Sequence, residues 1–250
     1  MAALRKADLA RMAWRSTLLQ ATWNYERQQG LGWAWSLGPA LERVYPDEAL
    51  RRARLVEHTA YFNTQPTMAS LVLGAVAGME EERAETGAPD AAAVARIKNV
   101  LGSTLAALGD RLFWFSLRPF AACLGILGAL TGGWPGAAAL WLCYNVVHQT
   151  VRFMGVGWGY RAGPGVLGES TRGRFQALIR WFSAAGAALV GAVAAMFLVP
   201  RGDPAPLVFQ AALAAGLTLG LIAARRSRPS PTEYGLGLCI LCVIAVWFRG

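Results

Sequence analysis

Polar residues stand between apolar segments in the first half of this chain, and they are the residues best suited to chemistry. They are the amide and hydroxyl groups of Asn63, Thr64 and Gln65, the carboxylates of Glu80 and Glu81, and the oppositely charged Asp110 and Arg118. Charged groups at membrane depth are costly and usually mark a pathway or a contact with a partner. We therefore interpret these residues as candidate contacts to a substrate or to another subunit.

Two of these groups also have a structural interpretation. Amides beside Pro66 can bind backbone groups that a helix break leaves free, so residues 63–65 suit a loop at the mouth of a short helix in either role. Residues 80–82 can form a solvated acidic face, or they can pair with arginines of this chain or of a partner. The sequence leaves both alternatives open.

Asp110 is a lone carboxylate between apolar stretches, an expensive position unless the group is paired or faces a cavity. Arg118 follows about two helical turns later, which is too far for a direct contact on one straight helix. An ion pair between elements and a substrate contact therefore both stay open. Asn145 and Arg152, in the next apolar element, can complete either network.

Cysteine and histidine chemistry is limited in this chain. The thiols of Cys123, Cys143, Cys239 and Cys242 lie in apolar surroundings, where cysteines act as small packing residues. The last two have the spacing of a redox or metal pair, but no further ligands stand near them. His58 and His148 are far apart in the sequence. The sequence thus indicates no metal site, no cofactor and no catalytic residue.

The composition places the chain in a lipid bilayer. Hydrophobic residues make up 55% of it and charged residues only 16%. The net charge of +9 would also suit nucleic acid, but no recognition module accompanies the basic residues. Lys and Arg collect in cytoplasmic loops of membrane proteins, and here they collect in residues 161–180 and 225–228. We therefore expect an all-α, polytopic membrane protein with these loops in the cytoplasm and residues 200–206 outside.

Residues 1–60 predict amphipathic helices that lie in the membrane interface. Apolar residues from Leu9 to Trp23 recur at helical spacing. Gly38-Pro39 is expected to end a short apolar piece, and a charged helix should resume from Glu48 to Thr59 after a turn.

Residues 61–160 predict a polar core of re-entrant, broken or hairpin helices. Pro66 opens an apolar piece that reaches only to Met79 and is short for a full span. Asp90 is a candidate cap for the next helix, and the glycine and proline cluster at residues 131–136 predicts a hairpin. Residues 161–250 should then hold a Gly-rich cytoplasmic loop and transmembrane helices at residues 181–199, 207–224 and 235–248.

Four blocks in this order carry a family resemblance. They are residues 18–27 (LLQATWNYER), 62–66 (FNTQP), 79–84 (MEEERA), and 97–119 with Ile97-Lys98, Gly109-Asp110, Phe113-Trp114 and Arg118-Pro119. With weaker similarity further on, the chain from Ala10 to Val199 resembles the IID membrane subunit of the mannose/fructose/sorbose-type phosphotransferase systems.

The resemblance implies a non-catalytic subunit of a sugar permease in the bacterial inner (cytoplasmic) membrane. In that family IID assembles with a second membrane subunit, IIC, and both handle a hexose such as mannose. A cytoplasmic IIAB component carries phosphate on histidine and phosphorylates the sugar as it enters. Carboxylate, amide and guanidinium groups suit this role, because the hydroxyls of a pyranose both donate and accept hydrogen bonds.

Two features depart from the family pattern. Arg111 stands where the family has proline after Gly-Asp, and the loop at Pro200 to Pro206 is shorter. Because both bear on transport, a second function stays open: a regulatory or scaffolding membrane protein that docks phosphorelay proteins and moves no sugar. A stand-alone small transporter is the third alternative.

Overall fold

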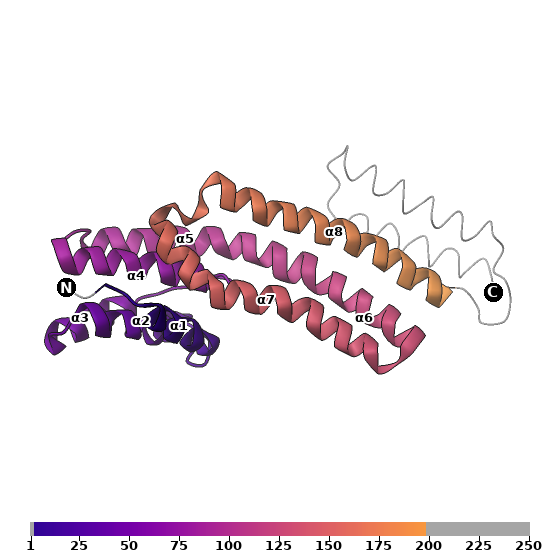
Figure 1. The fold of residues 1–250 in the computed structure, drawn as a ribbon, viewed down its shortest axis with the longest axis horizontal. Helices are drawn as coiled ribbons and strands as arrows, with labels where there is room; N and C mark the ends of the chain where they lie inside the picture. The colour runs from indigo at the N-terminus through magenta and orange to yellow at the C-terminus, as the bar shows by residue number, and fades with distance from the viewer. Residues whose placement is uncertain (1–2, 199–250) are drawn as a thin grey trace. The chain divides into compact units, whose positions relative to one another are not determined.

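The computed structural model describes residues 3–198 of the 250-residue chain. Over this range the chain is α-helical, with short 3-10 turns, a π-helical segment and no β-strand, and the expected all-α fold is confirmed (Figure 1). The chain divides into two compact units, Met1–Gly186 and Ala187–Gly250, and the packing below is that of the first. The predicted helices at residues 207–224 and 235–248, and the Cys239 and Cys242 pair, lie outside the described residues.

Three helices form the N-terminal part: α1 (Lys6–Arg15), α2 (Gly30–Val44) and α3 (Glu48–His58). The predicted amphipathic helix is α1, which buries Met12 against its neighbours and exposes Trp14. It is shorter than the apolar spacing indicated, because a 3-10 turn at Ser16–Leu18 ends it before Trp23. Helix α3 starts where predicted, and its first turn is capped by the side chain of Asp47.

Helix α2 runs through Pro39, where the sequence predicted an end. A proline inside a helix leaves the carbonyl four residues earlier without its usual donor. Here that carbonyl belongs to Trp35, and the guanidinium of Arg15 donates to it at 3.2 Å. A Cβ on Gly38 would lie only 2.7 Å from that guanidinium, so the glycine makes room for it. The predicted helix end is wrong because α1 supplies the missing donor.

Helix α4 (Ala69–Thr86) has 18 residues and continues well past Met79, so the apolar piece that looked too short is part of a longer, unbroken helix. It packs along α7 (Trp134–Ala162), and the two backbones approach closely. A Cβ on Gly74 would lie 2.0 Å from a backbone oxygen of α7, and one on Gly159 would lie 2.0 Å from a backbone oxygen of α4. Small residues at such contacts are typical of helix pairs in membranes.

Helices α5 (Ala91–Gly109) and α6 (Arg118–Gly132) are joined by a π-helical segment, Asp110–Leu117. The Asp90 side chain caps the start of α5, accepting from the Ala93 N–H at 2.7 Å, as predicted. The chain reverses at Gly133, which has a positive φ of 75°. Helices α6 and α7 then pack side by side as the predicted hairpin (Figure 1).

A 3-10 turn at Gly163–Leu167 connects α7 to α8 (Glu169–Leu198). The Gly-rich stretch that was expected as a loop therefore contains a helical turn, and α8 begins before the predicted start at Trp181. Helix α8 covers residues 181–198 of the helix expected at residues 181–199 and extends it at its N-terminal end.

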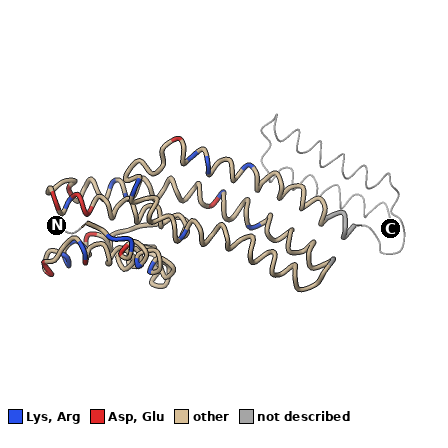
Figure 2. The backbone as a smooth tube through the Cα atoms, in the orientation of Figure 1, with Lys and Arg blue, Asp and Glu red and all other residues tan. Residues whose placement is uncertain are grey.

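Charged residues concentrate on α1 to α5 and on the first half of α8, whereas the α6–α7 hairpin carries few (Figure 2). Large apolar side chains instead face outward on the hairpin: Trp134 is 81% exposed and Trp141 is 62% exposed. Such a surface is rare in water and expected in lipid. Among the described helices, Ala91–Leu130 and Glu169–Val193 are long and apolar enough to cross a membrane.

Candidate functional site

The segment of residues 61–68, between α3 and α4, lies along a face of α5 that glycines leave free of side chains. Gly102 and Gly109, about two helical turns apart, provide that face. A Cβ on Gly102 would lie 2.8 Å from the Phe62 ring, and one on Gly109 would lie 2.7 Å from Gln65 Cβ. The Thr64 hydroxyl donates to the Gly102 carbonyl at 2.8 Å. These contacts fix the path of the loop across α5.

Thr64 and Gln65 are buried, and they bond inside the protein. Gln29 makes a paired contact with the Thr64 backbone: its Nε2 donates to the carbonyl at 2.7 Å, and its Oε1 accepts from the N–H at 3.0 Å. Gln65 Oε1 accepts from the backbone N–H groups of Thr67 and Met68 at 2.8 and 3.0 Å. The Gln65 side chain thus caps the chain just before α4, where the Met68 N–H also donates to the Gln65 carbonyl at 2.9 Å. Both residues therefore have the structural role, and their contact with a substrate or subunit stays a prediction.

Asn63 is exposed and lines a recess of about 610 Å³ between the loop and the outer face of α5. Tyr61, Asn99 and Ser103 provide the other polar side chains of the recess. Within residues 3–198 the side-chain amides of Asn63 and Asn99 form no hydrogen bond, so they are available to a ligand. Amides and hydroxyls both donate and accept, and a tyrosine ring adds an apolar face. This combination suits the hydroxyls and C–H groups of a sugar.

Glu80 is fully buried and lies at the centre of a network of ionisable side chains. Its Oε2 accepts from the Tyr45 hydroxyl at 2.7 Å, and its Oε1 lies 3.1 Å from His58 Nε2 and 3.3 Å from Arg83 Nη1. Arg83 also donates to Glu57 at 2.8 Å. We call these five residues the Glu80 network. It fastens the end of α2 and the C-terminal turn of α3 to α4.

The protonation states in the Glu80 network follow from its hydrogen bonds. The Trp33 indole N–H donates to His58 Nδ1 at 3.5 Å, which leaves the hydrogen of the neutral ring on Nε2, facing Glu80. Burial lowers the pKa of His58, although Glu80 acts in the opposite direction. Burial acts to raise the pKa of Glu80, but the hydrogen bond and charge of His58, with Tyr45 and Arg83, hold that pKa below its usual value. Glu80 is therefore ionised beside a neutral His58, and Arg83 balances its charge.

Glu57, at the outer end of the Glu80 network, is also ionised. Burial acts to raise its pKa, but hydrogen bonds from Arg83 and Arg54 outweigh burial and hold the pKa below the usual value. Arg83 thus stands between two carboxylates, 3.3 Å from Glu80 and 2.8 Å from Glu57.

Lys98 of α5 is a buried cation that was not among the predicted candidates. It is 3% exposed, and its Nζ donates to the backbone carbonyl of His58 at 3.1 Å. The ammonium also lies 5.1 Å from the ring centre of Trp33 and 5.4 Å from that of Phe62. A cation at the C-terminal end of α3 is favourable because carbonyl groups gather there. The signal for Lys98 was present in the sequence, as the last charge before the apolar stretch that follows Asn99.

The neighbours of Glu80 have different surroundings, because successive residues of a helix point about 100° apart. Glu81 accepts from the backbone N–H of Leu4 at 2.8 Å and from the hydroxyl of Tyr160 on α7. Glu82 is exposed. The three glutamates therefore do not form one shared acidic face. Contact of Glu80 or Glu81 with a sugar or a partner stays a prediction.

Asp110 and Arg118 mark the two ends of the π-helical segment. Asp110 is partly exposed and has no ion-pair partner among residues 3–198. Arg118 is exposed and lies over the Trp114 ring, 5.3 Å from its centre. The structure does not pair the two residues with each other, and both are open to contacts from outside the subunit.

Asn145 and Arg152 lie on α7 and are bound to backbone carbonyls. Asn145 donates to the Trp141 carbonyl at 2.9 Å within its own helix. Arg152 is buried and donates to the Ser16 carbonyl at 2.6 Å, so it ties α7 to the end of α1. In the part of the chain that the structure describes, no hydrogen bond or ion pair joins either residue to Asp110 or Arg118. Their predicted part in one network with Asp110 is not seen.

Glycine-packed helices, an apolar hairpin and a buried polar network beneath a docked loop together define an α-helical membrane protein. Comparison with protein families is consistent with this class and narrows it. The model of the "PTS system mannose/fructose/sorbose family IID component" matches residues 3–200. The chain belongs to this family, as the resemblance predicted, and it is a permease subunit of a phosphotransferase system.

Named relatives and solved structures agree with the family. The mannose-specific EIID component of Escherichia coli K12 is 35% identical over 191 residues, which cover 76% of this chain and 68% of the relative. The sorbose-specific EIID component of Klebsiella pneumoniae is 36% identical over 188 residues, covering 75% and 69%.

The chain is also similar to two solved structures. One is a chain from a complex of the mannose transporter ManYZ with microcin E492, with a TM-score of 0.62, 29% identity and coverage of 100% and 98%. The other is described as a membrane protein, with a TM-score of 0.73, 27% identity and 97% coverage of both chains.

Proposed function

We propose that this chain forms, together with a IIC membrane subunit, the path by which a hexose such as mannose crosses the bacterial inner (cytoplasmic) membrane. A IIAB phosphocarrier phosphorylates the sugar as it arrives, and this chain transfers no phosphate itself. The observation that carries the proposal is the similarity to a chain of the ManYZ mannose transporter along the whole length of both chains. Relatives named for mannose, sorbose and fructose support a hexose as the substrate.

The surroundings of the two histidines support a non-catalytic role. A histidine that accepts a phosphoryl group needs a ring nitrogen that a donor protein can reach. Both ring nitrogens of His58 are engaged inside the Glu80 network. His148 is half-buried and lies against Tyr144 and Phe113, with ring centres 5.5 and 5.9 Å away. We therefore place phosphoryl transfer on the IIAB partner.

We infer that the recess at Asn63 is where this subunit meets the sugar or the IIC surface beside the path. Its two free amides and its tyrosine ring face outward, whereas Thr64, Gln65 and Glu80 hold the fold behind it. Asp110 and Arg118 are the next candidates, because their side chains lack an ion-pair partner among the described residues. The side chains of Glu81, Asn145 and Arg152 already have partners within the subunit and are weaker candidates.

The proposal is tested by co-purifying the full chain with a IIC partner in detergent. The complex is then reconstituted in vesicles that are supplied with phosphorylated IIAB, and uptake of radiolabelled mannose is measured. A stable complex that accumulates sugar phosphate inside supports the permease role. A stable complex without uptake of any hexose would favour the regulatory or scaffolding alternative, and absence of IIC binding would contradict the proposal.

A further inference from the structure

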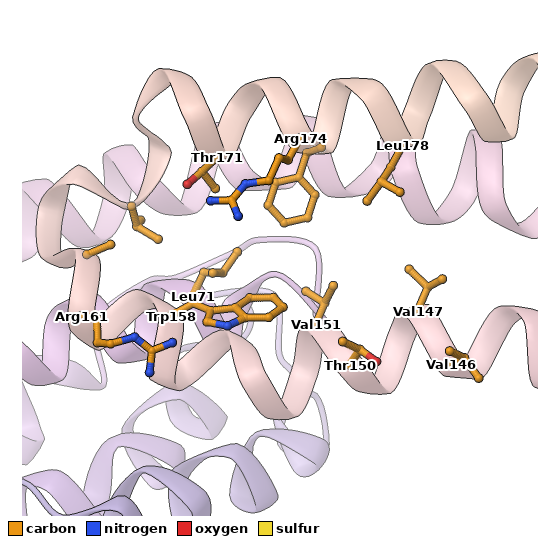
Figure 3. Close-up of a pocket in the computed structure, with 13 residues that line it drawn as sticks. Leu71, Val146, Val147, Thr150, Val151, Trp158, Arg161, Thr171, Arg174 and Leu178 are labelled. Carbon is orange, nitrogen blue, oxygen red and sulfur yellow. The ribbon is translucent and has the colours of Figure 1, made fainter.

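A groove of about 730 Å³ lies between α7 and the first part of α8, and the proposed transport role does not involve it. Its walls are largely apolar, with Val147, Val151 and Trp158 on α7 and Phe175 and Leu178 on α8 (Figure 3). Protein interiors leave few empty spaces larger than a water molecule, and this space is the size of a ligand pocket. Something other than this part of the chain is expected to fill it.

Two arginines lie at one end of the groove. Arg174 extends from α8 into the gap, whereas Arg161, at the same end on α7, lies along its own helix near Gly157, with Trp158 between the two guanidiniums (Figure 3). Neither guanidinium has a hydrogen bond or an ion pair with a residue in the range 3–198. Thr171 lines the same end and adds a hydroxyl group. The groove therefore has a cationic end, and the opposite end, at Val146 and Leu178, is apolar.

The α7 wall of the groove matches one leaflet of a membrane in length. It extends from Arg161 to Val146, about 22 Å at 1.5 Å per residue, whereas α8 lines the groove from Thr171 to Leu178, about 10 Å. Half of a bilayer that is about 40–45 Å thick, including its headgroup regions, is about 20–22 Å. The arginines lie at the end of α7 and the start of α8, and the basic residues there predict that this end of the groove faces the cytoplasm. Anionic lipids attract basic segments at that surface, and basic pockets between membrane helices bind their headgroups.

We propose that this groove is a binding site for an anionic phospholipid. The lipid phosphate binds at Arg174, Arg161 adds positive charge at the same end of the groove, and one acyl chain runs along the apolar walls toward Val146. Guanidinium groups match phosphate oxygens in charge and in hydrogen-bonding geometry. The bound lipid fills the space between α7 and α8, so it stabilises the position of the N-terminal part of α8 against the hairpin.

A lipid fits the groove better than a protein segment does. A helix of IIC or of a second copy would have to bring a carboxylate to each arginine and also fill a narrow channel of leaflet depth. A single acyl chain with a phosphate at one end supplies both features in one molecule. The site is separate from the Asn63 recess, which the α5 face and the loop form, so it does not depend on the transport proposal.

The test is lipid binding to the full chain in mild detergent, measured by native mass spectrometry. Phosphatidylglycerol is titrated against phosphatidylcholine with identical acyl chains. Each basic residue near a membrane surface contributes about 1 kcal/mol toward anionic lipid, so Arg161→Gln with Arg174→Gln should weaken phosphatidylglycerol binding roughly 30-fold. Binding of phosphatidylcholine should change little.

Matched controls separate this site from general charge. Arg172→Gln with Arg180→Gln removes the same charge from exposed positions of α8 that do not line the groove, and it should change binding less than about threefold. Thr150→Phe fills the groove without a change of charge and should weaken the binding of both lipids.

Four results would overturn the proposal. They are an equal loss of binding in the control pair, equal binding of the two lipids by the unmodified chain, competition by soluble glycerol phosphate at the concentration at which phosphatidylglycerol binds, and cross-linking of the groove to IIC in place of lipid. The last result would assign the groove to the subunit interface.

Discussion

Replacement of Glu80 by glutamine tests whether the Glu80 network stabilises the fold. The side chain keeps its shape and volume but loses its charge, and one oxygen becomes an NH₂ group. That group cannot accept the bonds that Glu80 receives at 2.7 Å from Tyr45, 3.1 Å from His58 and 3.3 Å from Arg83. At least one donor is then left facing another donor in a dry site.

The expected loss of stability follows from these contacts. Removal of one partner of a buried ion pair costs about 3–5 kcal/mol, because the remaining charge stays buried without compensation. Arg83 keeps its bond to Glu57, which favours the lower part of this range. For a chain of this size 1 kcal/mol shifts the melting temperature by about 2–4 °C, so a decrease of about 6–20 °C is expected.

The assay is thermal unfolding of the full chain in detergent, followed by tryptophan fluorescence. Glu82→Gln is the matched control, because Glu82 lies on the same helix and is exposed. An exposed substitution of this kind changes stability by less than about 0.5 kcal/mol. If Glu80→Gln and Glu82→Gln lowered the melting temperature equally, the assignment of Glu80 as a stabilising buried charge would be refuted.

Four further predictions concern packing, transport and pH. Gly159→Ala should strongly lower the melting temperature, because its Cβ would lie 2.0 Å from the α4 backbone, whereas the Cβ of Gly78→Ala would meet atoms of Tyr160 only at 3.5 Å or more and should be tolerated; equal effects would contradict the close helix contact. Asn63→Ala should reduce hexose uptake about fivefold, the effect of one lost hydrogen bond, with IIC binding intact, and unchanged uptake would remove the recess from the path. Asp110→Asn should also reduce uptake in an intact complex, and dissociation of the complex would show that its role is structural. The contribution of His58 to stability should be constant above about pH 6.5 and fall below it, because burial lowers the pKa of His58 and the unfolded chain takes up the proton first; His58→Gln should reduce this fall, and an unaltered profile below about pH 6.5 would exclude His58 as its cause.

The starts of α3 and α5 could be predicted from the sequence because they depend on residues close together in the chain. Asp47 and Asp90 each bind a backbone N–H three residues later, which is the local geometry of a helix cap. The turn between α6 and α7 was predicted in the same way, since glycines at residues 132 and 133 and Pro135 disfavour a continuous helix.

The course of α2 could not be predicted from local rules. Proline removes a donor wherever it stands, and the sequence does not show that Arg15 will lie beside the free Trp35 carbonyl. The close contact of α4 and α7 did have a signal. Glycines four apart recur at residues 74 and 78 and again at 155 and 159, which is a spacing of helix pairs in membranes.

The polar residues of the site were identified from the sequence, but their partners were not. Glu80 was a candidate, yet its partners Tyr45 and His58 lie 35 and 22 residues away. Gln29, which lies 35 residues from Thr64, had no signal in any motif. Residue types could therefore be predicted from the sequence, whereas the choice between an internal bond and an open contact required the packing of the helices.

The unbroken helix from Ala91 to Leu130 has a mechanical consequence for the subunit. Its 40 residues extend about 60 Å, twice the hydrocarbon thickness of about 30 Å. Near one end Lys98 fastens it to the end of α3, and its other end reaches the tip of the apolar hairpin. A tilt of only about 5° at the α3 end would displace that tip by about 5 Å. The length of the helix therefore amplifies, at the apolar hairpin, any change of tilt that arises at the polar end.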